Sequence, residues 1–142
     1  MSYINYACSL WDESGNNHLK RLRSLYRRAI KHIVSKDIET DEKIRIANLL
    51  PFKQQLQYNK CTFLYKIINR KGPKGLKKLF KVPKKDSRTG NFRLPLPRIG
   101  LYKSSFAFSG ASTWNQIPKN IKHINSFTLF KTRLKKYFMH KR

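Results

Sequence analysis

Positive charge dominates the last hundred residues of this chain and limits how they can fold. Residues 43–142 hold 25 lysines and arginines but a single acid, Asp86, whereas residues 1–42 balance seven basic residues against six acids. The net charge of the whole chain is +25. Without a partner, these like charges repel one another and weaken the compact state. A field of this density attracts polyanions, which are nucleic acids or anionic membranes.

The length and the cysteines place the chain in a broad class. A chain of 142 residues, of which 39% are hydrophobic, suggests one domain with a lean core, or one domain with an extension. Cys8 and Cys61 form neither a disulfide framework nor a metal pattern, so we expect a reducing compartment. The chain begins without the features of a signal peptide, and no apolar run nears the roughly 20 residues of a membrane span. We expect a soluble intracellular protein, in the nucleus or the cytoplasm.

Apolar residues three or four positions apart predict a helix over residues 17–34, capped by Asn16 or Asn17. Its apolar face is formed by Leu19, Leu22, Tyr26, Ala29, Ile30 and Ile33. Basic residues fill the other side in rows of the same spacing. The candidates for phosphate contact in these rows are Lys20, Arg21, Arg23, Arg27, Arg28 and Lys31. A merely solvated face is the alternative, and the shortage of neutralising acids makes it less favourable.

Three further helices are indicated downstream. A short one follows Thr40, with acids near its positive N-terminal end. A longer one spans about 51–69, with Pro51 in its first turn, where a missing N–H costs nothing. The last spans about 127–139, capped by Ser126. Its apolar stripe is formed by Phe127, Phe130, Leu134 and Phe138. The fold class that follows is mostly α.

The stretch between these helices mixes basic loop with extended segments. Residues 70–88 carry nine basic residues and one acid, and we expect a solvated loop with one helical turn at most. Pro95 and Pro97 restrict the next part to an edge strand or an extended loop, and residues 101–109 are expected to form a short strand. The basic loop supplies further candidates for phosphate contact, which are Lys77, Lys78, Lys84 and Lys85.

An uncharged passage from Phe108 to Pro118 interrupts these basic surroundings. It contains no lysine, arginine or acid, and Trp114 stands near its middle. We expect a turn and a short helix around Trp114, with the indole filling a pocket between the preceding strand-like segment and the last helix. A charge at such a place would have to be desolvated, which accounts for its absence.

No catalytic or metal-binding constellation stands out in the sequence. The acids lie mainly beside predicted helix starts, where a capping role is favoured. The four histidines have no cysteine at ligand spacing, and the Gly-Pro-Lys-Gly turn lacks the ending of a phosphate-binding loop. We therefore expect no cofactor, no metal and no enzymatic activity from this chain alone.

The end of the chain carries a recognisable series of motifs. A small-residue turn, a Trp-Asn-x-Ile-Pro motif and a Ser-Phe-x-x-Phe-Lys-x-x-Leu-Lys helix are formed by Ser109, Gly110, Trp114, Asn115, Ile117, Pro118, Phe127, Phe130, Lys131, Leu134 and Lys135. Together with residues 4–11, a basic helix, 49–69 and 93–118, they resemble the C-terminal part of the reverse transcriptase of non-LTR, LINE-type retrotransposons of the jockey and CR1 kind. The matching motifs are structural patterns, and Trp114, Pro118, Phe127, Phe130 and Leu134 are expected to have structural roles.

The resemblance implies the thumb and C-terminal extension of an RNA-directed DNA polymerase. It implies a small helical thumb-like bundle over residues 1–70, a basic linker loop over 71–92 and an extension over 93–142. A thumb grips the template–primer duplex, so the implied partners are RNA, DNA or an RNA–DNA hybrid, together with a palm and fingers polymerase domain. No Asp-Asp pair, which the palm uses to hold its metal ions, occurs in the chain. The implied role is nucleic-acid binding without catalysis, by a fragment of the polymerase.

Two alternatives stay open. In the first, the chain is a non-functional, structural or protein-interaction remnant of a decayed mobile element, and its apolar residues 3–11 would pack on a missing palm domain. Such a chain should expose that patch and self-associate. In the second, it is a basic amphipathic binder of membrane surfaces. Pro95, Pro97 and Pro118 count against this reading, and binding to anionic vesicles but not to RNA would favour it.

Overall fold

The computed structural model describes residues 16–33, 38–69, 74–80, 88–94, 100–103 and 105–141. Every regular element in these ranges is a helix, so the prediction of a mostly α-helical fold is confirmed. The elements are α3 (Asn16–Ile33), α4 (Thr40–Ile46), α5 (Phe52–Ile68), the 3-10 helix η1 (Lys74–Leu79), α6 (Gly100–Lys103), α7 (Phe106–Asn115), α8 (Lys119–Lys122) and α9 (Phe127–His140).

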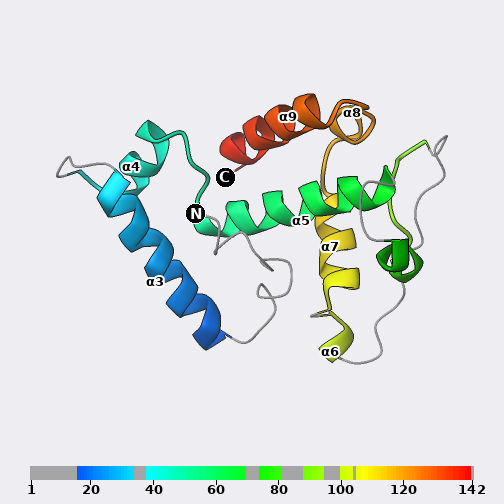
Figure 1. Ribbon diagram of the computed structural model, residues 1–142, viewed down its shortest axis with the longest axis horizontal. Coiled ribbons are helices and arrows are strands. Elements are labelled where there is room, and N and C mark those ends of the chain that lie inside the picture. Colours follow the sequence, from blue (N-terminus) through cyan, green and yellow to red (C-terminus); the bar gives the residue numbers. More distant parts are fainter. Residues whose placement is uncertain are drawn as a thin grey trace.

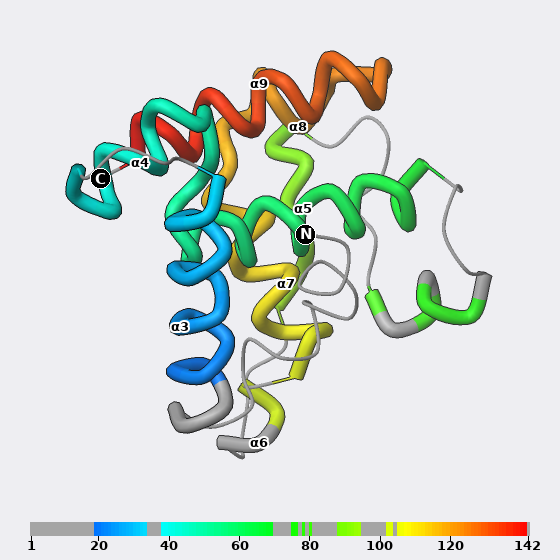
Figure 2. Tube along the Cα trace, turned by 60° about the vertical axis from the view of Figure 1, so that its left-hand side comes forward, coloured from blue at the N-terminus to red at the C-terminus, as the bar shows by residue number. Residues whose placement is uncertain are grey.

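Helix α5 is the central element of the fold (Figure 1). Helices α3 and α4 pack together at the end where α5 begins, while α7 and α9 pack on α5 itself. Figure 2, turned by 60°, shows α9 and α7 on opposite sides of α5. Residues of the predicted thumb-like region and of the predicted extension therefore share one core.

The boundaries of the main helices follow from local chemistry. Helices α3, α4, α5 and α9 lie where the apolar spacing predicts them. Pro51 directly precedes α5, where its missing N–H costs no intrahelical hydrogen bond. The Ser126 hydroxyl accepts a hydrogen bond from the Leu129 N–H at 3.5 Å, so the predicted cap of the last helix is confirmed.

The strand expected over residues 101–109 is wrong, because residues 101–103 belong to α6 and residues 106–109 to α7. Ser105 begins α7 as its cap, and its hydroxyl accepts a hydrogen bond from the Phe108 N–H at 3.3 Å. Gly110 and Trp114, four residues apart, are both buried on α7, which is the helical spacing. The aromatic and small residues thus pack with period 3.6 rather than 2, and Trp114 lies in the last turn of this helix. Pro95, Pro97 and residues 3–11 lie outside the described residues.

The larger of the two apolar clusters among the described residues joins α5, α7 and α9. The Tyr65 and Trp114 rings both stack on the Phe130 ring, with centroids 4.2 Å and 5.8 Å from it. The Tyr65 hydroxyl also lies 2.8 Å and 2.6 Å from the carbonyl oxygens of Ile124 and Asn125, just before α9. The buried members contributed by α9 are Phe130, Leu134 and Phe138. The stripe predicted for the last helix is therefore turned into the core, with Phe127 packed at its edge.

The smaller cluster holds α3 against α4 and the start of α5. Tyr26 and Ile30 are 2% and 0% exposed, and they pack with Ile44 of α4. The Tyr26 hydroxyl donates a hydrogen bond to the Leu50 carbonyl, and its ring lies 5.6 Å from that of Phe52. The prediction that Ile33 belongs to the buried face is wrong. Its side chain is 53% exposed at the last residue of α3, beyond the part of the helix that contacts this cluster.

Adjacent residues Trp114 and Asn115 fasten an extended segment to the larger cluster. The indole N–H of Trp114 donates to the Gly90 carbonyl at 3.0 Å, and its ring meets Phe92 edge to face. The Asn115 amide pairs with both backbone groups of Phe92: its oxygen accepts from the N–H at 2.8 Å, and its nitrogen donates to the carbonyl at 2.9 Å. Trp114 thus lies between residues 90–92 and α9, in a joint where a charge would be desolvated.

Candidate nucleic-acid interface

Helix α3 presents its basic residues to solvent and buries Tyr26 and Ile30 on its opposite side, although Leu25 and Ile33 are also exposed. The opposite sides of the helix differ because 3.6 residues complete each turn. All six predicted cations are exposed, and they are Lys20, Arg21, Arg23, Arg27, Arg28 and Lys31. Along the axis they extend about 16 Å, at 1.5 Å per residue. This length is enough to follow several phosphates of one nucleic-acid strand.

No acidic residue of α3 neutralises these six cations. The sequence of α3 contains no acid. In the described part of the chain the acids begin at Glu39, and Asp41 and Glu42 occupy the first turn of α4, where the positive helix end favours them. Four of the six cations are arginines, whose planar guanidinium groups can bind a phosphate with two parallel hydrogen bonds. We define these six residues as the α3 basic face.

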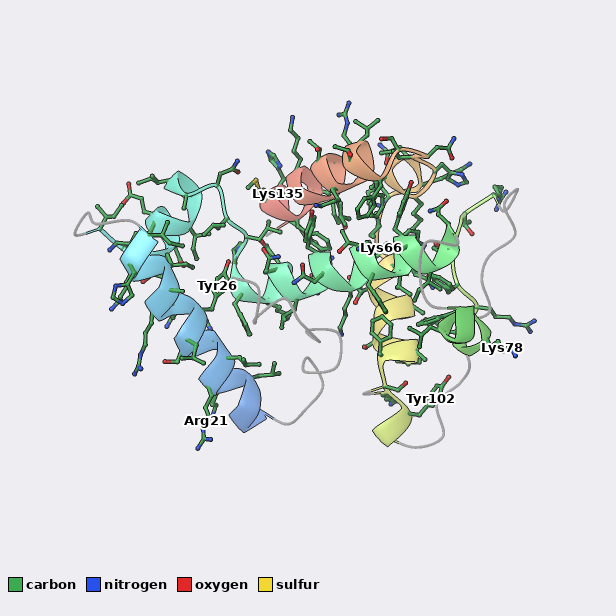
Figure 3. The ribbon with its side chains drawn as sticks, in the orientation of Figure 1. Arg21, Tyr26, Lys66, Lys78, Tyr102 and Lys135 are labelled. Atoms are coloured by element: carbon green, nitrogen blue, oxygen red, sulfur yellow. The ribbon has the colours of Figure 1, made fainter. Side chains whose placement is uncertain are left out.

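The second predicted group is not brought to the α3 basic face. Lys77 and Lys78 lie in η1, and Lys78 is exposed, whereas Lys84 and Lys85 lie outside the described residues. Figure 3 shows Arg21 on α3 and Lys78 beyond the far end of α5, at opposite ends of the molecule. Lys78 and the α3 basic face therefore do not form one compact patch.

Helix α9 carries a third group of exposed cations. Lys131, Arg133 and Lys136 are exposed on its outer side. The Lys131 ammonium lies 5.6 Å from the centre of the Phe127 ring, and that of Lys66 on α5 lies 5.4 Å from the same ring. Lys131 and Lys136 can be recognised in the sequence because they lie off the apolar stripe of α9.

Lys60 and Lys122 are engaged in hydrogen bonds within the protein. Lys60 is only 1% exposed, and its ammonium donates to the Ser109 hydroxyl at 2.9 Å. The Lys122 ammonium donates to the Asn91 side-chain oxygen at 2.6 Å and to the Asn115 carbonyl at 3.1 Å. Burial lowers the pKa of the Lys122 ammonium. Counting every lysine as surface charge therefore overestimates the surface available to a polyanion.

A pocket opens between α3 and the first turn of α5. Its volume is about 600 Å³. Its apolar residues come from both helices, and the cations Lys20 and Arg23 belong to the α3 basic face. The residues that line it are Leu19, Lys20, Arg23, Pro51, Phe52, Lys53 and Leu56. Sequence reasoning missed this pocket, because it depends on how the two helices are placed.

Other kinds of site find little support in the described residues. Nowhere among them do three or more histidine, cysteine, aspartate or glutamate side chains gather as metal ligands would. None of their helices is both long and apolar enough to cross a membrane. Cys61 is fully buried, and burial raises the pKa of its thiol, which keeps it protonated and unreactive.

Comparison of the chain with protein-family models, with curated proteins and with solved structures finds no match. The resemblance to a retrotransposon reverse transcriptase rests on the sequence motifs alone. The physical argument for the interface rests on the α3 basic face.

Proposed function

We propose that this protein binds nucleic acid through the phosphates, and that the α3 basic face makes the principal contacts. The observation that carries the proposal is six exposed cations on one acid-free helix, whose other side is held in the protein by Tyr26 and Ile30. Each neutralised phosphate releases condensed counterions, which favours binding without regard to sequence. Holding the helix against α4 and α5 keeps the row of cations in one orientation.

The resemblance gives this proposal a more specific form. In it the chain is the thumb-like part of a non-LTR reverse transcriptase and grips the template–primer duplex, while a palm domain supplies the catalysis. Two features are consistent with a stable module of this kind. The Trp-Asn motif fastens residues 90–92, and the last helix buries its apolar stripe against α5. We propose no enzymatic activity for this chain by itself.

The test measures binding of a fluorescein-labelled 20-base-pair RNA–DNA hybrid by fluorescence anisotropy. The main variant changes Arg21, Arg23, Arg27 and Arg28 to glutamine. The matched control removes the same number of exposed charges at another surface, through Lys66→Gln, Lys131→Gln, Arg133→Gln and Lys136→Gln. The proposal predicts that the α3 variant loses at least about tenfold in affinity at 100 mM salt, because several phosphate contacts disappear, and that the control loses much less.

Two results would contradict the proposal. Equal losses in the two variants would mean that net charge, rather than the α3 basic face, governs binding. A wild-type chain that binds anionic vesicles but none of a hybrid, a DNA duplex or single-stranded RNA would instead support a membrane-surface protein.

A further inference from the structure

The pocket between α3 and α5 combines an apolar wall with a cationic rim. Leu19 from α3 and Phe52 and Leu56 from α5 supply the apolar surface. Lys20 and Arg23 from α3 and Lys53 from α5 supply three exposed cations at its mouth. A ligand that fits must therefore have an apolar body and anionic groups on more than one side.

Phe52 is held in place as part of the pocket wall. One side of its ring packs against Tyr26, with centroids 5.6 Å apart, and Tyr26 is itself fixed by its hydrogen bond to Leu50. Phe52 is only half-buried, so part of its ring remains open to the pocket. An aromatic ring in a fixed orientation is the group on which single-stranded nucleic-acid binders stack a base.

We infer that this pocket takes one unpaired base of a nucleic-acid strand, while Lys20, Arg23 and Lys53 contact the phosphates on either side of it. The inference rests on the proposed function, because Lys20 and Arg23 also belong to the α3 basic face. A volume of about 600 Å³ lies within the usual range of small-ligand pockets, roughly 300–1,000 Å³. The first turn of α5 adds the positive end of a helix dipole to the three cations.

The arrangement favours a nucleotide over other ligands with an apolar body. The pocket opens beside a row of cations that continues along α3 through Arg27 and Lys31, as a strand with regularly spaced phosphates requires. A base within a duplex is stacked and paired on all sides and has no free face to offer. The pocket therefore selects strands that contain unpaired nucleotides, such as a single-stranded template or the end of a primer.

The experiment compares two fluorescein-labelled strands of 12 nucleotides, one of deoxythymidine and one in which every base is replaced by an abasic site. Both carry the same phosphates, so only base contacts distinguish them. We expect the wild-type chain to bind the thymidine strand about five- to tenfold more tightly, as one stacked base implies. Phe52→Leu, which keeps an apolar side chain but removes the ring, should abolish most of that difference.

The matched control is Phe63→Leu, at the other end of α5. The Phe63 ring packs against Phe106 at 5.5 Å and takes no part in the pocket. This control should keep the full preference for the thymidine strand. Circular dichroism melting tests whether both variants are folded. The comparison of the thymidine and abasic strands with the wild-type chain does not depend on either variant.

Distinct results would overturn the inference and the proposed function. Equal binding of the two strands by the wild-type chain, or a preference that survives in Phe52→Leu, would overturn the base pocket while leaving salt-dependent phosphate binding intact. Loss of salt-dependent binding to every strand would overturn the proposed function itself. Binding of phosphatidylserine vesicles that depends on Phe52, with no effect of removing the bases, would also overturn the inference and assign the pocket to a lipid.

Discussion

The rings of Tyr65 and Phe130 stack with their centroids 4.2 Å apart, so the central helix α5 and the last helix α9 meet through two buried aromatic residues. The Phe130 ring also stacks against that of Trp114, 5.8 Å away. This series of three rings joins segments that are far apart in the sequence. The stability of the fold should therefore be most sensitive at Trp114, where the series also meets residues 90–92.

Replacing Trp114 tests this joint. Trp114→Ala should lower the free energy of unfolding by about 3–5 kcal/mol, because the indole is 2% exposed and its removal leaves a cavity. Trp114→Phe retains a ring but loses the hydrogen bond to the Gly90 carbonyl, and should cost less. Urea denaturation followed by circular dichroism measures both. An alanine variant as stable as the wild-type chain would rule out the joint.

Asn115 provides a separate test of the same attachment. Asn115→Ala removes both hydrogen bonds to the Phe92 backbone and should destabilise the chain by about 1–3 kcal/mol. Asn115→Asp keeps the acceptor for the Phe92 N–H but places a carboxylate oxygen opposite the Phe92 carbonyl, so it should not restore wild-type stability. Urea denaturation measures the stability of both variants. An aspartate variant as stable as the wild-type chain would contradict the role of the two hydrogen bonds between Asn115 and Phe92.

Tyr26 should make stability depend on pH in the alkaline range. Burial raises the pKa of its phenol above the unfolded value of 10.0, so the folded state holds the proton more tightly. Its contribution is therefore fully present below pH 10 and is lost as pH rises from there through the raised folded pKa. Tyr26→Phe lacks this contribution. At neutral pH its free energy of unfolding should be lower by about 1–2 kcal/mol, because the Leu50 carbonyl loses its hydrogen-bond partner.

The measurement is the difference in unfolding free energy between wild type and Tyr26→Phe at pH 7, 9, 10 and 11. Other tyrosines contribute to both proteins and cancel in the difference. The difference in unfolding free energy between the two proteins should become smaller above pH 10. A gap that widens with pH would show that the phenol ionises more easily in the folded state, contrary to its burial.

Cys61 should report the opening of the core. Its thiol is fully buried and burial raises its pKa, so little thiolate is present or accessible in the native state. In a Cys8→Ser variant, which leaves Cys61 as the single thiol, reaction with a disulfide reagent should be slower than that of the urea-unfolded chain by at least about a hundredfold. Equal rates in the two states would contradict the packing of α5 against α7 and α9.

Local spacing predicts much of this fold, because the helices are amphipathic and their caps are local. The positions of α3 and α9, the Ser126 cap and the buried Phe130, Leu134 and Phe138 follow from residues within a few turns. The strand predicted over residues 101–109 is wrong, since periodicity cannot distinguish a strand from a helix in so short an apolar run. The Ser105 cap and the burial of Gly110, where an added Cβ would lie only 3.1 Å from the Phe106 ring, favour the helix.

The features that sequence reasoning missed depend on contacts between distant segments. The Asn115 amide reaches the backbone of Phe92, 23 positions earlier, and no spacing rule marks such a pair. The burial of Lys60 is hidden as well, because a lysine is ordinarily assigned to the surface. The pocket at Phe52 exists only because Tyr26 fixes α3 beside α5.

The salt dependence of binding tests the central claim most directly. The dissociation constant of the RNA–DNA hybrid is measured between 50 and 300 mM salt for the wild-type chain and for the variant with Arg21, Arg23, Arg27 and Arg28 changed to glutamine. If about six phosphates are engaged, log K should fall against log salt with a slope of about −5 for wild type, and loss of four contacts should make the slope about 3.5 smaller in magnitude for the variant. A wild-type slope near zero, or equal slopes for the two proteins, would contradict phosphate binding by the α3 basic face.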